Sequence, residues 1–176
     1  MYDFAQWLEL TPVSVTIKSI SWIVPLVQSI HIFTIAIVFG SILMVALRVL
    51  GLVRTDQTPA AVLARFSPWI TRGLVVLLLT GAILLVGEPI RELMSLSFWL
   101  KMGLIVIGVL SAVAFRRTLA SAVTADGPAH FASGTKGMAM AMVMLWLMII
   151  FLGRAIAYDV EVWGSLSLAP RAGATE

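Results

Sequence analysis

His31 and Gln28 are the residues in this sequence whose types and spacing best suit cofactor chemistry. They lie one helical turn apart, and so on one face, inside an apolar stretch from Trp22 to Leu47 that contains no Lys, Arg, Asp or Glu. The stretch is longer than the roughly 20 residues that a helix needs to cross a bilayer core. An ionisable side chain at that depth costs about 2.5 kcal/mol or more, so His31 is expected to face protein. An imidazole in that setting is a candidate metal ligand, in particular an axial ligand of haem iron.

Two cations are expected at a similar depth. Lys101 and Arg154 each lie about one turn inside an apolar run. Together with His31 they would suit a b-type haem, with the imidazole on the iron and the cations on the propionates, or equally a quinone or another anionic headgroup. The simpler interpretation remains open: both cations extend to the headgroups, and His31 forms an interhelical hydrogen bond to Gln28, Thr34 or a backbone group.

The methionines near the end of the chain offer a second possibility. Met140, Met144 and Met148 share one helical face. Thioethers bind Cu(I) or serve as a second haem ligand, although adaptable packing is the commoner role of such a stripe. The other histidine, His130, lies among Gly, Pro, Ala and Ser and is expected in a solvent-exposed loop, which leaves no second histidine at a matching depth.

Composition defines the class of protein. The 176 residues are 60% hydrophobic and 12% charged, with a mean hydropathy of +1.03, which indicates a single integral membrane domain over residues 1–176. The absence of cysteine excludes disulfides, iron–sulfur clusters, thiolate zinc sites and c-type haem. The Lys and Arg residues bracket apolar runs, so no nucleic-acid partner is expected. No phosphate loop, carboxylate pair or nucleophile–base motif is present, which favours a non-catalytic or electron-transfer subunit over an enzyme.

The hydrophobic pattern predicts an all-α membrane protein, an up-down bundle of four transmembrane helices with a short interfacial helix before it. The interfacial helix is expected over residues 2–20, where Thr11-Pro12 gives a helix-start signal. The four spans are expected at about 22–47, 66–87, 97–115 and 137–158.

Charge predicts the orientation. Most of the Lys and Arg residues fall on the two longer connections, and most of the acids fall on the opposite face. The positive-inside rule then places the long connections in the cytoplasm and both termini in the periplasm of a bacterial inner (cytoplasmic) membrane. On that outer face we expect an aromatic belt formed by Trp7, Trp22, Trp99 and Trp163.

Three segments carry a resemblance to known proteins: IVPLVQSIHIFTIAIVFGSILMVALRVLG at 23–51, FSPWITRGLVVLLLTGAILL at 66–85 and FWLKMGLIVIGVLSAVAF at 98–115, with LGRAIAY at 152–158 in support. The chain resembles an uncharacterised group of bacterial four-span membrane proteins. More distantly it resembles the copper-resistance D proteins and the membrane-type protoporphyrinogen oxidases. That resemblance implies a b-type haem, with His31 and Lys101 at the family's first-span His and third-span Lys. Arg116 replaces a histidine expected after the third span, and the oxidase activity is not implied.

We therefore expect a small membrane subunit that binds a cofactor, b-type haem above all, through His31, Gln28, Lys101 and Arg154. Such a subunit would transfer electrons or anchor a membrane or periplasmic redox partner within the lipid bilayer. The main alternative is a cofactor-free accessory subunit of a larger membrane complex. A second alternative is copper handling.

Overall fold

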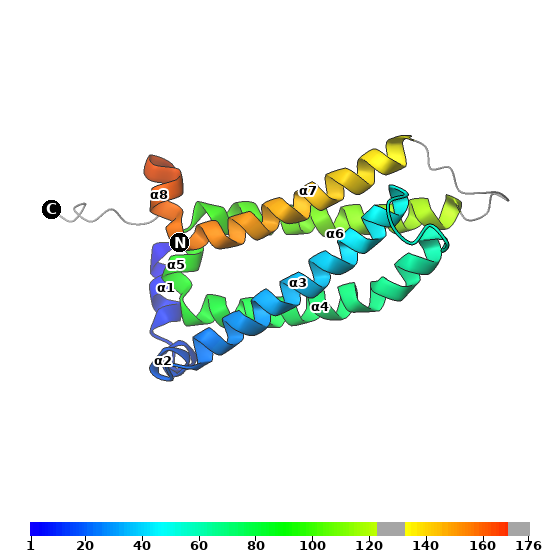
Figure 1. Cartoon of the computed structure of the whole chain (residues 1–176). Coiled ribbons are helices and arrows are strands. Elements are labelled where there is room, and N and C mark those ends of the chain that lie inside the picture. Colours follow the sequence, from blue (N-terminus) through cyan, green and yellow to red (C-terminus); the bar gives the residue numbers. More distant parts are fainter. Residues whose placement is uncertain (123–132, 169–176) are drawn as a thin grey trace.

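Four long helices dominate the computed structural model, which describes residues 1–122 and 133–168 (Figure 1). They are α3 (Ile23–Val49), α4 (Pro59–Gly87), α6 (Leu96–Ala122) and α7 (Ser133–Ala155). Each contains a segment with a mean hydropathy between 2.1 and 2.5, long and apolar enough to cross a membrane. No strand occurs within the described residues. The prediction of an all-helical protein with four candidate membrane spans is confirmed.

The remaining helices are short, and those that Figure 1 labels lie together at one end of the long helices, where α4 connects to α6. They are α1 (Tyr2–Glu9), α2 (Pro12–Ser19), α5 (Pro89–Leu93), η1 (Ile156–Tyr158), α8 (Asp159–Trp163) and η2 (Gly164–Leu166). The segment 2–20 is thus two helices, which meet at Leu10 and Thr11. The Thr11 hydroxyl accepts a hydrogen bond from the Ser14 amide at 3.4 Å, and Pro12 occupies the first helical position, as the sequence predicts.

The long helices extend beyond the predicted spans. α4 begins at Pro59, because Thr58 caps it by accepting from the Ala61 amide at 3.2 Å, the same Thr-Pro start as in α2. α6 continues past Phe115, and α7 starts at Ser133. After Ala155 the chain tightens into the η1 turn, which covers the predicted end of the fourth span. His130 lies outside the described residues.

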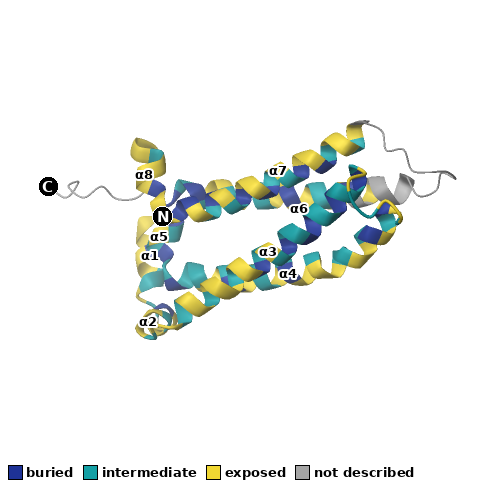
Figure 2. Ribbon diagram, viewed as in Figure 1, coloured by how far each residue is buried: buried dark blue, intermediate teal, exposed yellow. Residues whose placement is uncertain are grey.

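The apolar core occupies the half of the bundle farther from α5. All four long helices contribute to it, with Val38, Ile42, Val45, Ala46 and Val49 from α3, Val62 from α4, Phe115 from α6, and Ala139, Met142, Trp146 and Ile149 from α7. A smaller cluster of Ala5, Leu93 and Met94 joins α1 to the α5 region. The outward surfaces of the long helices are largely exposed in Figure 2, and they carry many large apolar side chains, as a lipid-facing surface requires.

A buried carboxylate holds the start of α6 to α8 and to Ser167. Asp159 accepts hydrogen bonds from the Ser95 hydroxyl at 2.7 Å, the Ser97 amide at 3.2 Å and the Ser167 hydroxyl at 2.6 Å. The Ser95 hydroxyl also accepts from the Phe98 amide at 3.3 Å, as an N-cap does. Asp159 therefore neutralises the amino end of α6, where a negative charge is favoured.

Close packing of α3 on α4 depends on Gly73. A Cβ atom at this position would overlap Cγ2 of Val38, a fully buried β-branched side chain with little freedom to rotate. We expect Gly73→Ala to destabilise the protein by about 1–3 kcal/mol, measured as a lower midpoint of thermal unfolding in detergent. Gly40→Ala is the matched control, since a Cβ there has no neighbour within 4 Å. Equal midpoints for the two variants would contradict this account of the helix pair.

Candidate functional site

His31 is oriented by a residue of the neighbouring helix. Its Nδ1 atom lies 2.7 Å from Oγ1 of Thr80 in α4. The Thr80 hydroxyl donates its own hydrogen to the Val76 carbonyl, also at 2.7 Å, so toward His31 it acts as an acceptor. In this pairing His31 Nδ1 carries the ring proton and Nε2 keeps a free lone pair, whereas a hydroxyl that donated to Nδ1 would put the ring proton on Nε2. The form protonated on Nδ1 is the tautomer in which a histidine binds a metal through Nε2.

The rest of the imidazole ring lies next to a glycine. A Cβ atom at Gly81 would come within 3.6 Å of His31 Cε1. Because Gly81 has no side chain, nothing from this position covers the ring edge between the two nitrogens. Thr80 therefore supplies an acceptor for Nδ1, and Gly81 lies against the ring edge without a side chain.

Lys101 of α6 lies close enough to His31 of α3 to interact with it electrostatically. Its side chain is partly buried and runs along Gly153 of α7, where an added Cβ would lie 3.5 Å from the Lys101 ammonium nitrogen. The structure thus places the third-span lysine within electrostatic range of the first-span histidine, the two residues that the sequence singles out.

Glu92 of α5 is a further member of this group that sequence reasoning missed. It lies within electrostatic range of Lys101 and 3.6 Å from the Arg91 guanidinium. Burial raises the pKa of the Glu92 carboxyl, and the positive charges of Lys101 and Arg91 partly offset that increase. Glu88 forms an ion pair with Arg91 beside it. The turn at α5 brings Glu92 back toward Lys101; the sequence predicts a short connection between the second and third spans but not which of its residues faces the site.

The other two predicted site residues are placed differently. Arg154 is exposed, and its Nη2 donates to the Tyr158 hydroxyl at 3.0 Å while the guanidinium carbon lies 5.0 Å from the centroid of the Tyr158 ring. Gln28 is exposed on α3. Thr34, considered as a partner for His31, instead donates to the Ile30 carbonyl of its own helix.

The methionine stripe faces away from the core. Met140, Met144 and Met148 are 51%, 59% and 52% exposed, whereas Met142 between them is 8% exposed and part of the core. The stripe is therefore positioned toward lipid or another protein chain. Among the described residues, no group of three or more His, Asp or Glu side chains is placed to hold a metal ion.

Comparison with known proteins gives one result. A family model described as a family of unknown function, DUF6644, matches residues 4–159. The chain belongs to this family. The DUF6644 match spans all the long helices and includes His31, Thr80, Glu92 and Lys101. The predicted resemblance to an uncharacterised family is thereby confirmed.

No curated protein and no solved structure matches the chain. The more distant resemblance to the copper-resistance D proteins and the membrane-type protoporphyrinogen oxidases gains no support from the comparisons.

Proposed function

We propose that this DUF6644 protein is a small subunit of the bacterial inner membrane that binds b-type haem through His31 and serves electron transfer or anchors a redox partner. The observation that carries the proposal is the hydrogen bond from His31 to Thr80. It fixes the ring and leaves Nε2 unprotonated, as an axial iron ligand must be. A haem bound there would supply reversible one-electron transfer.

Lys101 is the residue best placed to meet a propionate of this group. Its ammonium lies within electrostatic range of the imidazole, and the outer part of the side chain lies against Gly153. Glu92 partly neutralises Lys101, so a propionate would compete with Glu92 for it. Arg154 would bind a propionate only after its hydrogen bond to Tyr158 breaks. Gln28 would contact the cofactor only if its side chain, which is exposed here, changed position.

A cofactor-free accessory subunit remains the second candidate, and one observation favours it. The bond from Nδ1 to Thr80 links α3 to α4, which is the usual role of a polar side chain in a span. The exposed methionine stripe would then be a surface for another subunit. Copper handling has weaker support, because the three thioethers face outward from a single helix.

An absorbance spectrum separates the first two candidates. The protein purified with its native assembly is expected to show a Soret band and, after reduction, the bands of b-type haem. Extraction with acidic acetone should release the haem, since the chain has no cysteine to hold it covalently. A colourless native assembly would overturn the haem proposal and leave the accessory subunit in first place.

The proposal includes an orientation. We place the α3–α4 connection in the cytoplasm and both termini in the periplasm, with α1 and α2 lying in the interface before an up-down bundle. The support is the charge distribution together with Trp7 and Trp22, which are both largely exposed near the end where the short helices gather. Trp99 and Trp163 occur at the same end and donate to the Leu93 carbonyl and the Ser97 hydroxyl.

Single cysteines test this orientation cleanly in a chain that has none. Thr55 lies between α3 and α4, Ser165 lies in η2, and both are exposed. In intact spheroplasts, a membrane-impermeant maleimide should label Ser165→Cys and should label Thr55→Cys only after permeabilisation. The reverse pattern would show that the bundle is inserted the other way round.

A further inference from the structure

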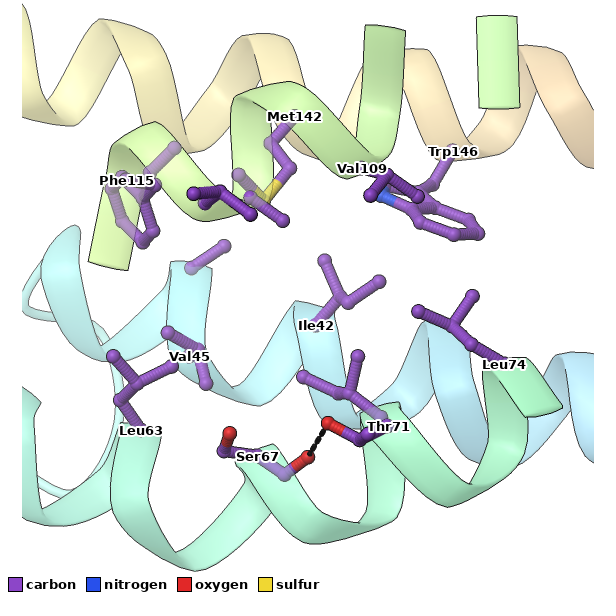
Figure 3. A pocket seen from close by; sticks show the side chains of 15 residues that line it. Ile42, Val45, Leu63, Ser67, Thr71, Leu74, Val109, Phe115, Met142 and Trp146 are labelled. Atoms are coloured by element: carbon purple, nitrogen blue, oxygen red, sulfur yellow. Dashed lines mark hydrogen bonds between the residues drawn. The ribbon is translucent and has the colours of Figure 1, made fainter. Parts of the chain in front are cut away.

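An apolar cavity lies in the half of the bundle that contains the core, away from His31 and Lys101. Its volume is about 160 Å³, and all four long helices line it (Figure 3). Thr71, Val109 and Val113 line it and are also exposed, so the cavity opens at the surface between α4 and α6. In a membrane that opening faces the acyl chains, and any ligand must enter from the bilayer.

The size of the cavity suits a single six-membered ring. A cavity of about 150 Å³ lined by apolar side chains binds benzene in another protein. The walls here are chiefly Ile, Val, Leu, Ala, Phe and Met side chains, which offer dispersion contacts to a flat apolar ring.

One wall carries a polar group without a partner. Trp146 lines the cavity, is 5% exposed, and its buried indole Nε1 has no hydrogen-bond acceptor among the described residues. The edge of the ring that bears this nitrogen packs on α6, where a Cβ at Gly108 would lie 3.8 Å from Trp146 Cε2. A buried donor left unpaired costs free energy, and an acceptor brought by a ligand would recover it.

A second polar group lies across the cavity. Ser67 contributes its hydroxyl from α4, on the opposite side from Trp146 in Figure 3, whereas Thr71 already donates to the Ser67 carbonyl at 3.0 Å. An acceptor oxygen at each end of a ring matches these two donors in chemistry. A hydrocarbon chain would meet neither.

We propose that this cavity binds the ring of a membrane quinone, with one carbonyl oxygen accepting from Trp146 Nε1. The nitrogen is covered in this structure, so the ligand must displace a neighbour; Val109, which lies beside it in Figure 3, is at the mouth of the cavity. The site is separate from the proposed haem site, because its α3 wall begins at Ile42, three turns beyond His31.

The test measures saturable binding of radiolabelled duroquinone to the full chain in nanodiscs, with empty nanodiscs as background. Duroquinone is a fully methylated benzoquinone that lacks a tail, and durene is the hydrocarbon of the same ring and methyl groups. We expect saturable duroquinone binding to the wild type and weak competition by durene. Trp146→Phe, which keeps the aromatic ring and removes the donor, should weaken duroquinone binding roughly tenfold.

Three further variants complete the design. Ala112→Leu should abolish binding by filling the cavity, whereas Trp69→Phe, an exposed Trp on α4, should leave it unchanged. His31→Ala should also leave it unchanged, which separates this site from the haem proposal. The quinone proposal is overturned if the wild type shows no saturable binding or if Trp146→Phe binds as tightly as the wild type. Equal competition by durene would mean that the cavity accepts hydrocarbon, and would overturn it as well.

Discussion

Replacing His31 with alanine is expected to remove the Soret band and the reduced b-type bands while the protein still inserts into the membrane. The loss follows because His31 Nε2 is the proposed iron ligand, and insertion survives because the change removes a costly polar group from a span. Haem content per chain and the amount of protein in the membrane fraction are the two measurements. Added imidazole should partly restore the spectrum, which a purely structural role of His31 does not predict.

Variants of nearby residues refine this result. Thr80→Val keeps the shape of the side chain but removes the acceptor for Nδ1, so we expect haem affinity to fall by roughly tenfold without complete loss. Thr34→Val is the matched control on α3, because the Thr34 hydroxyl donates to the Ile30 carbonyl of its own helix. Lys101→Gln should weaken retention less than His31→Ala does, since a propionate partner does not hold the iron. An unchanged spectrum in His31→Ala would exclude this histidine as the ligand.

The second large effect is expected at Asp159. Changing it to alanine removes the acceptor for the Ser95 hydroxyl, the Ser97 amide and the Ser167 hydroxyl. We expect a loss of about 3 kcal/mol in stability, because the buried Ser95 and Ser97 donors lose their acceptor and the amino end of α6 loses its negative charge. The midpoint of thermal unfolding in detergent measures the overall effect, and hydrogen exchange at the Phe98 amide measures it locally.

Glu161→Ala is the control for this prediction. Glu161 lies on the same short helix, α8, and is exposed. The Glu161→Ala variant should unfold at nearly the same temperature as the wild type, as variants with surface substitutions usually do. If the Asp159 and Glu161 variants were equally stable, the carboxylate would have no role in fixing α6.

Much of the fold follows from hydropathy and helix-start signals. Four long apolar runs predict four long helices, and Thr11-Pro12 predicts the start of α2. The same signal at Thr58-Pro59 starts α4 well before the predicted span, because a helix need not begin where its apolar segment begins. The Asp159 contacts are beyond such reasoning. Two of them join residues more than sixty positions apart, and the order of polar residues at a membrane edge does not reveal which of them become buried.

In the candidate site, too, the sequence predicts individual residues but not the partners that they contact. A histidine inside an apolar run identifies His31, and helix periodicity places it on a face, but its partner Thr80 comes from another helix forty-nine positions away. Lys101 and Arg154 look equivalent in sequence, each one turn inside an apolar run. Packing separates them, because Lys101 folds along Gly153 toward the bundle while Arg154 turns outward to Tyr158.

The packing of α1 has a consequence for how the chain is assembled during synthesis. Ala5 has no exposed surface, and its cluster partners Leu93 and Met94 follow α3 and α4 in the chain. Because a ribosome makes the amino terminus first, α1 emerges long before the surface on which it rests exists. Ala5 must therefore wait at the membrane until Leu93 and Met94 have been made. The order of translation and the order of packing are therefore different in this protein.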